Sequence, residues 1–147
     1  MSTESWETAT GVLRLATRLV DGIQAGLAER GFADVRPAHG FAFVLLSAGP
    51  TTTTQLAEHL GVTKQAASEL VQQLAERGYL RREPDPADRR TKVLVLTERG
   101  AACTRAAEQA AAGTVDGWRS TLSSAQFDDL QRALRLLSGN GRLRPSW

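Results

Sequence analysis

The hydrophobic periodicity of this chain changes from helical to extended at Tyr79. Before Tyr79 the apolar residues recur at spacings of three and four, which is typical of amphipathic helices. After it, residues 80–83 and 91–96 have the short, extended patterns of two strands, and residues 84–90 between them are turn formers and charges. Helical spacing resumes at about Thr97. The sequence therefore predicts a mostly α fold, in which a small β-hairpin wing follows four helices and precedes two more.

The helices predicted at the two ends of the chain each carry a long apolar stripe. We expect the first helix over residues 6–31, closed by Gly31, and the last over residues 123–138. The stripes consist of Trp6, Ala9, Leu13, Ala16, Val20, Ile23 and Leu27, and of Phe127, Leu130, Leu134 and Leu137. Such a stripe packs within one subunit or forms a seam between two subunits, and the sequence leaves both open. We expect the tail, residues 139–147, to be frayed.

Several helix ends are marked by capping residues. Pro37 suits the first turn of the second helix, whose Phe41, Val44, Leu45 and Leu46 we expect to be mostly buried. The other end markers are Thr52 with Gln55 and Ser123 with Gln126, which have capping-box spacing, Thr63 as an N-cap, and Gly61 and Gly78 as helix terminators.

Residues 53–97 have the pattern of a helix-turn-helix followed by the hairpin. Ala57 is small enough for two helices to cross closely, and Gly61 occupies the turn between them. The second helix presents a polar face made of Thr63, Lys64, Gln65, Ser68, Glu69 and Gln72. Gln and Lys can hydrogen-bond base edges in a major groove, and the helix N-terminus suits a phosphate. Any amphipathic helix has a polar face, however, and the Glu69 carboxylate would repel phosphate.

The hairpin strengthens the case for nucleic acid. Its basic residues are Arg81, Arg82, Arg89, Arg90 and Lys92. Asp88 and Arg90 are two residues apart, so on an extended strand they lie on the same side, where the carboxylate can orient the guanidinium. An oriented arginine on a thin projection is suited to insertion into a minor groove. A solvated turn with incidental ion pairs is the alternative interpretation.

Composition excludes several other classes of protein. The single cysteine, Cys103, excludes an internal disulfide, and with only His39 and His59 as histidines we expect no metal site. Phosphate-loop, nucleophile-elbow and His-x-x-x-His spacings are absent, so we expect neither an enzyme nor a cofactor. No apolar run approaches the ~20 residues of a membrane span, which favours a cytoplasmic protein without a membrane partner. The net charge of +2 neither requires nor excludes nucleic acid.

Taken together, these motifs resemble the MarR family (multiple antibiotic resistance regulators). The resemblance rests on the helix-turn-helix, on Arg77-Gly78-Tyr79-Leu80 at its exit, and on the hairpin run Asp85-Pro86-Ala87-Asp88-Arg89-Arg90 before Val93-Leu94-Val95-Leu96-Thr97. It extends over about residues 7–138, and the Asp-x-Arg of the wing is its most specific element.

The resemblance implies one MarR-like domain over residues 1–147, with a winged helix-turn-helix lobe at 53–97 and dimerisation helices at 6–31 and 97–138. It also implies a homodimer that binds double-stranded DNA at a pseudo-palindromic operator, usually as a repressor released by a small-molecule effector. By position, residues 63–72 would form the recognition helix. In the wing, Asp88, Arg89, Arg90 and Lys92 would contact DNA, with Arg90 at the tip oriented by Asp88.

Family members often respond to a small aromatic ligand in a cleft between the dimer helices and the DNA-binding lobe. The candidates for such a cleft are Leu13, His39, Phe43 and Trp118, each of which is more simply interpreted as a core residue. Cys103 is more simply a small buried residue than a redox sensor. The alternative function is a winged-helix module that binds only protein, as a dimeric scaffold or antirepressor. The operator, the effector and the choice between repression and activation stay open.

Overall fold

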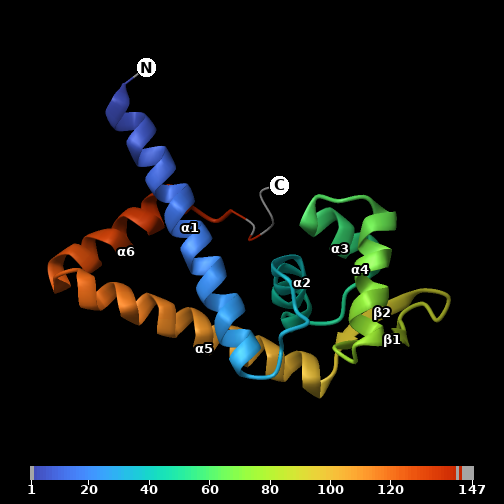
Figure 1. The fold of residues 1–147 in the computed structure, drawn as a ribbon. Coiled ribbons are helices and arrows are strands. Elements are labelled where there is room, and N and C mark those ends of the chain that lie inside the picture. Colours follow the sequence, from blue (N-terminus) through green and yellow to red (C-terminus); the bar gives the residue numbers. More distant parts are fainter. Residues whose placement is uncertain (1, 142, 144–147) are drawn as a thin grey trace. The chain divides into compact units, whose positions relative to one another are not determined.

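The protein is described by a computed structural model that covers residues 2–141 and 143. The predicted order of elements, four helices, a hairpin and two helices, is confirmed (Figure 1). The elements are α1 (Thr3–Glu29), α2 (Pro37–Ser47), α3 (Thr53–Leu60), α4 (Lys64–Glu76), β1 (Leu80–Pro84), β2 (Lys92–Leu96), α5 (Glu98–Thr121) and α6 (Ser124–Ser138). The predicted fraying of the tail falls largely on residues 142 and 144–147, which lie outside the described residues.

The capping residues form the hydrogen bonds that the sequence predicts. Thr52 Oγ1 accepts from the Gln55 backbone N–H at 3.1 Å, and Gln55 Oε1 accepts from the Thr52 N–H at 2.9 Å. Ser123 and Gln126 repeat this reciprocal pair at the start of α6, with distances of 3.2 and 2.9 Å. Each box satisfies backbone donors that a helix start leaves without partners, which explains why α3 and α6 begin where they do.

The chain divides into two compact units, and the first contains residues 2–34 and 106–139. Within it, α1 and the later turns of α5 approach closely at two glycines. A Cβ on Gly22 would collide with the Thr114 side chain, and a Cβ on Gly26 would collide with Ala110. These small residues therefore let the two helices pack with their backbones near each other.

Much of the apolar stripe of α1 and α6 is exposed in the single chain. Leu27 and Phe127 are buried, but Leu13 is 68% exposed and Leu137 is 85% exposed. The interpretation of Leu13 as a core residue is therefore wrong for the isolated chain. The periodicity places an apolar residue on one face of a helix, but it does not say whether its own chain covers that face.

The second unit contains residues 35–105 and holds the hairpin. Its core includes Leu56, Leu74, Tyr79 and Leu94, each no more than 1% exposed. The first turn of α5 comes so close to the link between α4 and β1 that a Cβ on Gly100 would collide with the Tyr79 carbonyl oxygen. One expectation for α2 is wrong. Val44 is 46% exposed, because the helix buries His39, Ala42, Phe43 and Leu46 instead.

The hairpin is a two-stranded antiparallel ribbon. Its register pairs Leu80 with Leu96 at the base and Pro84 with Lys92 next to the tip. Thr51 joins the ribbon through backbone hydrogen bonds to Leu94 in both directions. In the described part of the chain, no helix is long and apolar enough to cross a membrane.

Candidate nucleic-acid interface

The helices α3 and α4 form the predicted helix-turn-helix. Gly61 ends α3 in the left-handed region, with φ of +70°, and the chain turns there into α4. Thr63 Oγ1 then accepts from the Ala66 N–H at 3.1 Å and caps α4. The buried faces of the pair carry Leu56, Ala57 and Leu60 on α3, and Ala67, Val71 and Leu74 on α4. This packing holds α4 by one side and leaves its opposite side in solvent.

All six residues predicted for the DNA-contacting face are on the exposed side of α4 or at its cap. They are Thr63, Lys64, Gln65, Ser68, Glu69 and Gln72. In Gln72, however, both ends of the carboxamide are engaged: its Oε1 accepts from Arg82 Nη2 at 3.1 Å, and its Nε2 donates to Glu76 Oε1 at 2.8 Å. The face thus combines hydrogen-bonding side chains and a helix N-terminus with one free carboxylate, that of Glu69.

Asp88 orients Arg90 as expected, but not by the expected geometry. Both residues lie in the connection between the strands rather than on a strand. Asp88 Oδ1 accepts from the Arg90 backbone N–H and from Arg90 Nε, each at 3.1 Å, so a local turn holds the pair. These hydrogen bonds hold the pKa of the Asp88 carboxyl below its ordinary value, and the bond from the Arg90 side chain contributes most. The lowered pKa follows because Arg90 binds the charged form of this carboxyl, which is the form present at neutral pH.

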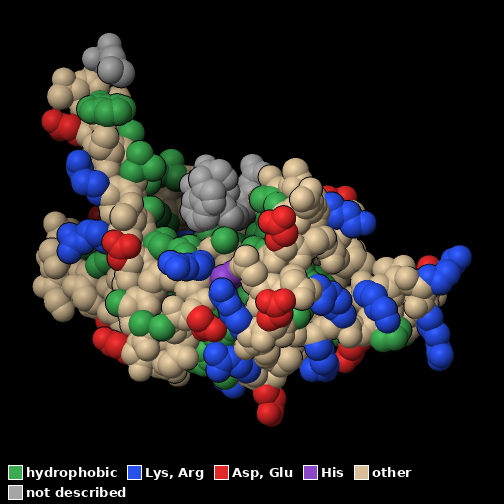
Figure 2. Space-filling view, turned by 45° about the vertical axis from the view of Figure 1, so that its right-hand side comes forward, with side chains coloured by type: hydrophobic (Ala, Val, Ile, Leu, Met, Phe, Trp, Pro, Cys, Tyr) green, Lys and Arg blue, Asp and Glu red, His purple; other side chains and the backbone are tan. Residues whose placement is uncertain are grey.

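The tip of the wing is a basic projection. The Arg90 side chain is 92% exposed despite its contact with Asp88. Arg89 and Lys92 are exposed as well, and Lys92 opens β2 opposite Pro84. Figure 2 shows Lys and Arg side chains gathered at the end of this projection. A thin ribbon with exposed guanidinium groups at its end has the shape and charge to enter a minor groove.

Two contacts of α4 were not predicted from the sequence. One is the Arg82–Gln72 hydrogen bond, which joins β1 to α4. The other joins α2 to α4, where His39 Nε2 lies 3.3 Å from Gln73 Oε1. Strand alternation places Arg82 on the same side of β1 as buried Leu80, so the sequence indicates that Arg82 faces the rest of the unit. The second contact has no local signal, because it depends on how α2 packs against α4.

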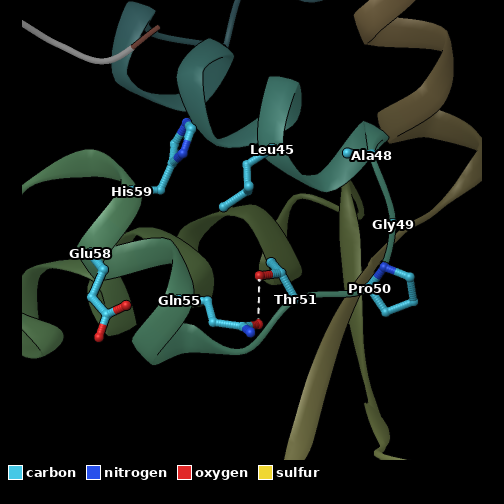
Figure 3. A pocket seen from close by; sticks show the side chains of 8 residues that line it. All are labelled: Leu45, Ala48, Gly49, Pro50, Thr51, Gln55, Glu58 and His59. Atoms are coloured by element: carbon cyan, nitrogen blue, oxygen red, sulfur yellow. Dashed lines mark hydrogen bonds between the residues drawn. The ribbon is translucent and has the colours of Figure 1, made fainter. Parts of the chain in front are cut away.

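The winged-helix unit also contains a cavity of about 380 Å³ between the end of α2 and α3. Leu45, Ala48, Pro50 and Thr51 line one part of it, and Gln55, Glu58 and His59 on α3 line another. Figure 3 shows Thr51 donating to Gln55 Oε1 at 3.0 Å, while the His59 ring points toward α2. His59 Nε2 is buried and makes no hydrogen bond within the described residues.

The other candidate residues are placed as follows. His39, Phe43 and Cys103 are buried, as their interpretation as core residues predicts. Trp118 is only partly buried. Among residues 2–141 and 143, no cluster of three or more His, Cys, Asp or Glu side chains could hold a metal ion.

This geometry defines a winged helix-turn-helix protein. In a comparison with known proteins, residues 33–91 match the model of the MarR family. The chain is 36% identical over 92 residues to YcgE of Bacillus subtilis (strain 168), described as an uncharacterized HTH-type transcriptional regulator. That alignment covers 60% of this chain and 57% of YcgE, so the chain spans little more than half of that relative.

Solved structures show the same fold over nearly the whole chain. The structure of Rv1404 from Mycobacterium tuberculosis superposes with a TM-score of 0.78 at 27% identity, covering 96% of this chain and 97% of that one. CouR from Rhodococcus jostii RHA1, solved with p-coumaroyl-CoA, superposes with a TM-score of 0.69 at 19% identity, covering 97% and 99%. The match at residues 33–91 and the shared fold confirm the resemblance to the MarR family.

Proposed function

We propose that the protein is a DNA-binding transcriptional regulator. The observation that carries the proposal is the joint placement of two elements in one compact unit. The exposed face of α4 offers Lys64, Gln65 and Ser68, and the hairpin beside it ends in the oriented, exposed Arg90. A helix for the major groove next to an arginine-tipped ribbon for the minor groove is the arrangement that a winged-helix DNA reader needs.

In this mechanism the two elements have different tasks. The α4 residues at positions 63–72 enter the major groove, where the Gln65 carboxamide can pair with a base edge and Lys64 can reach a base or a phosphate. The wing residues Asp88, Arg89, Arg90 and Lys92 follow the adjacent backbone, and Arg90 enters the minor groove. The face at α4 supplies specificity and the wing supplies affinity for any DNA.

The proposed active form is a homodimer, with the helices at 6–31 and 97–138 as the dimerisation elements. The exposed apolar residues of α1 and α6, Trp6, Leu13, Leu134 and Leu137 among them, support this assembly because water would otherwise cover them. A two-fold dimer places two copies of α4 on half-sites about one helical turn, ~10 bp, apart. Such a protein would bind a pseudo-palindromic operator and repress by excluding the transcription machinery.

Release by a small aromatic effector completes the proposal. Its support is the ligand p-coumaroyl-CoA in the structure of CouR, a protein with the same fold. The cavity beside α3 is large enough for a small molecule, and α3 is the helix against which α4 packs. A thermal-shift screen of aromatic acids and their thioesters, followed by DNA titration with each compound that binds, tests this part.

A second function is kept because one observation favours it. Glu69 is exposed in the middle of the α4 face, where its charge opposes a phosphate backbone. The alternative is a winged-helix module that binds protein only.

Salt dependence separates the two functions. Purified protein is titrated against labelled DNA from upstream of its own gene and against random DNA, by fluorescence anisotropy. A binder with about 6–10 phosphate contacts loses ~10³–10⁵ in affinity between about 50 and 200 mM salt. A protein-only module binds neither DNA at either concentration. Tight, salt-steep binding that prefers the upstream fragment supports the regulator.

A further inference from the structure

Two neighbouring arginines of β1 have different surroundings, because strand side chains alternate between two faces. Arg81 shares a face with Glu83, and its Nε donates to Glu83 Oε1 at 2.6 Å. Arg82 lies on the opposite face with Leu80, toward α4, where its Nη2 donates to Gln72 Oε1 at 3.1 Å. One arginine is therefore neutralised by a carboxylate, while the other is joined to the recognition helix.

The carboxamide of Gln72 serves as a support for Arg82. Its oxygen accepts from Arg82, and its nitrogen donates to Glu76 one helical turn further on. With one bond at each end, the amide is held in one orientation, while its second N–H and the second lone pair of its oxygen stay available. Gln72 thus has a supporting role in addition to the base contact that its position on α4 predicts.

The charge of Arg82 remains available to a ligand. Among the described residues no carboxylate pairs with its guanidinium, and only Nη2 is engaged. The side chain is exposed at the junction of α4 with the hairpin. When α4 lies in a major groove, the Arg82 guanidinium at the edge of the exposed α4 face lies at the border of the groove. The phosphates of one DNA strand run along this border. A guanidinium is the side-chain group best matched to a phosphate.

We propose that Arg82 is a phosphate-contacting residue at the base of the wing and that Gln72 is its positioning residue. The inference rests on the proposed function, since it requires DNA at α4. It adds a DNA contact that lies between the contacts made by α4 and those made by the wing tip. Because phosphates carry no sequence, this contact contributes equally to operator and random DNA.

The test compares Arg82→Ala with Arg81→Ala, a matched change one residue away on the other face. Affinity for operator and random DNA is measured by anisotropy across a series of salt concentrations. Arg82→Ala is expected to weaken both complexes to a similar degree and to reduce the salt slope by about 1. Arg81→Ala is expected to leave the slope unchanged. Arg82→Gln, which removes the charge but keeps the side chain as far as Cδ and a polar end, gives the same result if charge is what DNA recognises. Thermal melting checks that each variant folds.

Gln72→Met tests the positioning role. If Gln72 orients Arg82, Gln72→Met weakens operator and random DNA alike, and it has no further effect when Arg82 is already alanine. A loss confined to the operator would mean that Gln72 contacts a base, and it would overturn the positioning role.

Different results would overturn the proposed function and the role of Arg82. Wild-type protein that binds no DNA at low salt would overturn the proposed function and this inference with it. Wild-type protein that binds with a steep salt dependence, alongside an Arg82→Ala variant of equal affinity and slope, would overturn this inference alone.

Discussion

His39 Nε2 lies 3.3 Å from Gln73 Oε1 and so links the start of α2 to α4. The hydrogen bond of the other ring nitrogen determines which of these two atoms is the donor. His39 Nδ1 accepts from the Arg36 backbone N–H at 2.9 Å, so the neutral ring carries its proton on Nε2 and donates it to Gln73. The buried ring thus caps α2 with one nitrogen and holds α4 with the other.

Replacing His39 therefore disturbs both helices. We expect His39→Leu to lower the free energy of unfolding by about 1–3 kcal/mol, because two partly buried hydrogen bonds, to the Arg36 N–H and to Gln73, are lost. His39→Gln keeps an acceptor for Arg36 and a donor for Gln73, and we expect it to retain most of the stability. Urea unfolding followed by circular dichroism measures the stability of both variants. Equal losses for His39→Leu and His39→Gln would show that the ring stabilises the protein by packing and not through its hydrogen bonds.

The Asp88–Arg90 pair leads to a prediction about pH. Hydrogen bonds from the Arg90 side chain and backbone lower the pKa of Asp88, so the carboxylate stays charged at pH values where an unperturbed aspartate takes up a proton. The contact is complete above the ordinary aspartate pKa and is lost only as the pH falls through the lowered value. Carboxyl NMR titration of Asp88 should show this lowered pKa, and Arg90→Ala should raise it toward the ordinary value. Identical titrations in the two proteins would show that Asp88 does not hold the Arg90 side chain.

Gly100 gives a prediction for the packing of the first turn of α5 against Tyr79 and Leu96 within the winged-helix unit. A Cβ there would collide with the Tyr79 carbonyl and would lie 2.8 Å from Leu96 Cδ2. We expect Gly100→Ala to destabilise the protein by about 1–3 kcal/mol, as overpacking does. Gly113→Ala in the same helix is the control, because its Cβ would meet nothing within 4 Å. Helix propensity predicts a gain of up to about 1 kcal/mol for that change. Thermal melts that rank the two variants in the opposite order would contradict this packing.

The exposed apolar residues of α6 predict the oligomeric state. Leu134 and Leu137 are 50% and 85% exposed in the single chain. If they lie in a dimer seam, changing both to Asp should shift sedimentation at micromolar concentration from dimer to monomer. Val44→Asp, a change at a residue 46% exposed on α2, is expected to leave the dimer intact. A monomeric wild-type protein would contradict the seam.

Features encoded within a few residues were predictable from the sequence. The capping boxes at Thr52 and Ser123, the turn at Gly61 and the hairpin with its Asp88–Arg90 pair depend on neighbours in the chain, so residue type and spacing are enough to place them. For the wing pair the partners were right and the geometry was wrong, because a turn rather than a strand brings them together.

The contacts that hold α4 to α2 and to β1 could not be predicted in the same way. Gln73 meets a residue 34 positions away, and Gln72 meets one 10 positions away on β1. These meetings depend on how helices and strands pack, which residue patterns specify only in outline. The exposure of Leu13 and Val44 was missed for a related reason, since periodicity identifies an apolar face without identifying what covers it.

The most direct test of the account is the affinity of Arg90→Ala for DNA, measured by fluorescence anisotropy beside wild type and Gln65→Ala. The account predicts that Arg90→Ala weakens binding to the upstream fragment and to random DNA alike. It predicts that Gln65→Ala costs about 1–3 kcal/mol on the upstream fragment only. Unchanged affinity of Arg90→Ala for both DNAs would contradict the role of the wing, and with it the claim that α4 and the hairpin form one DNA-binding surface.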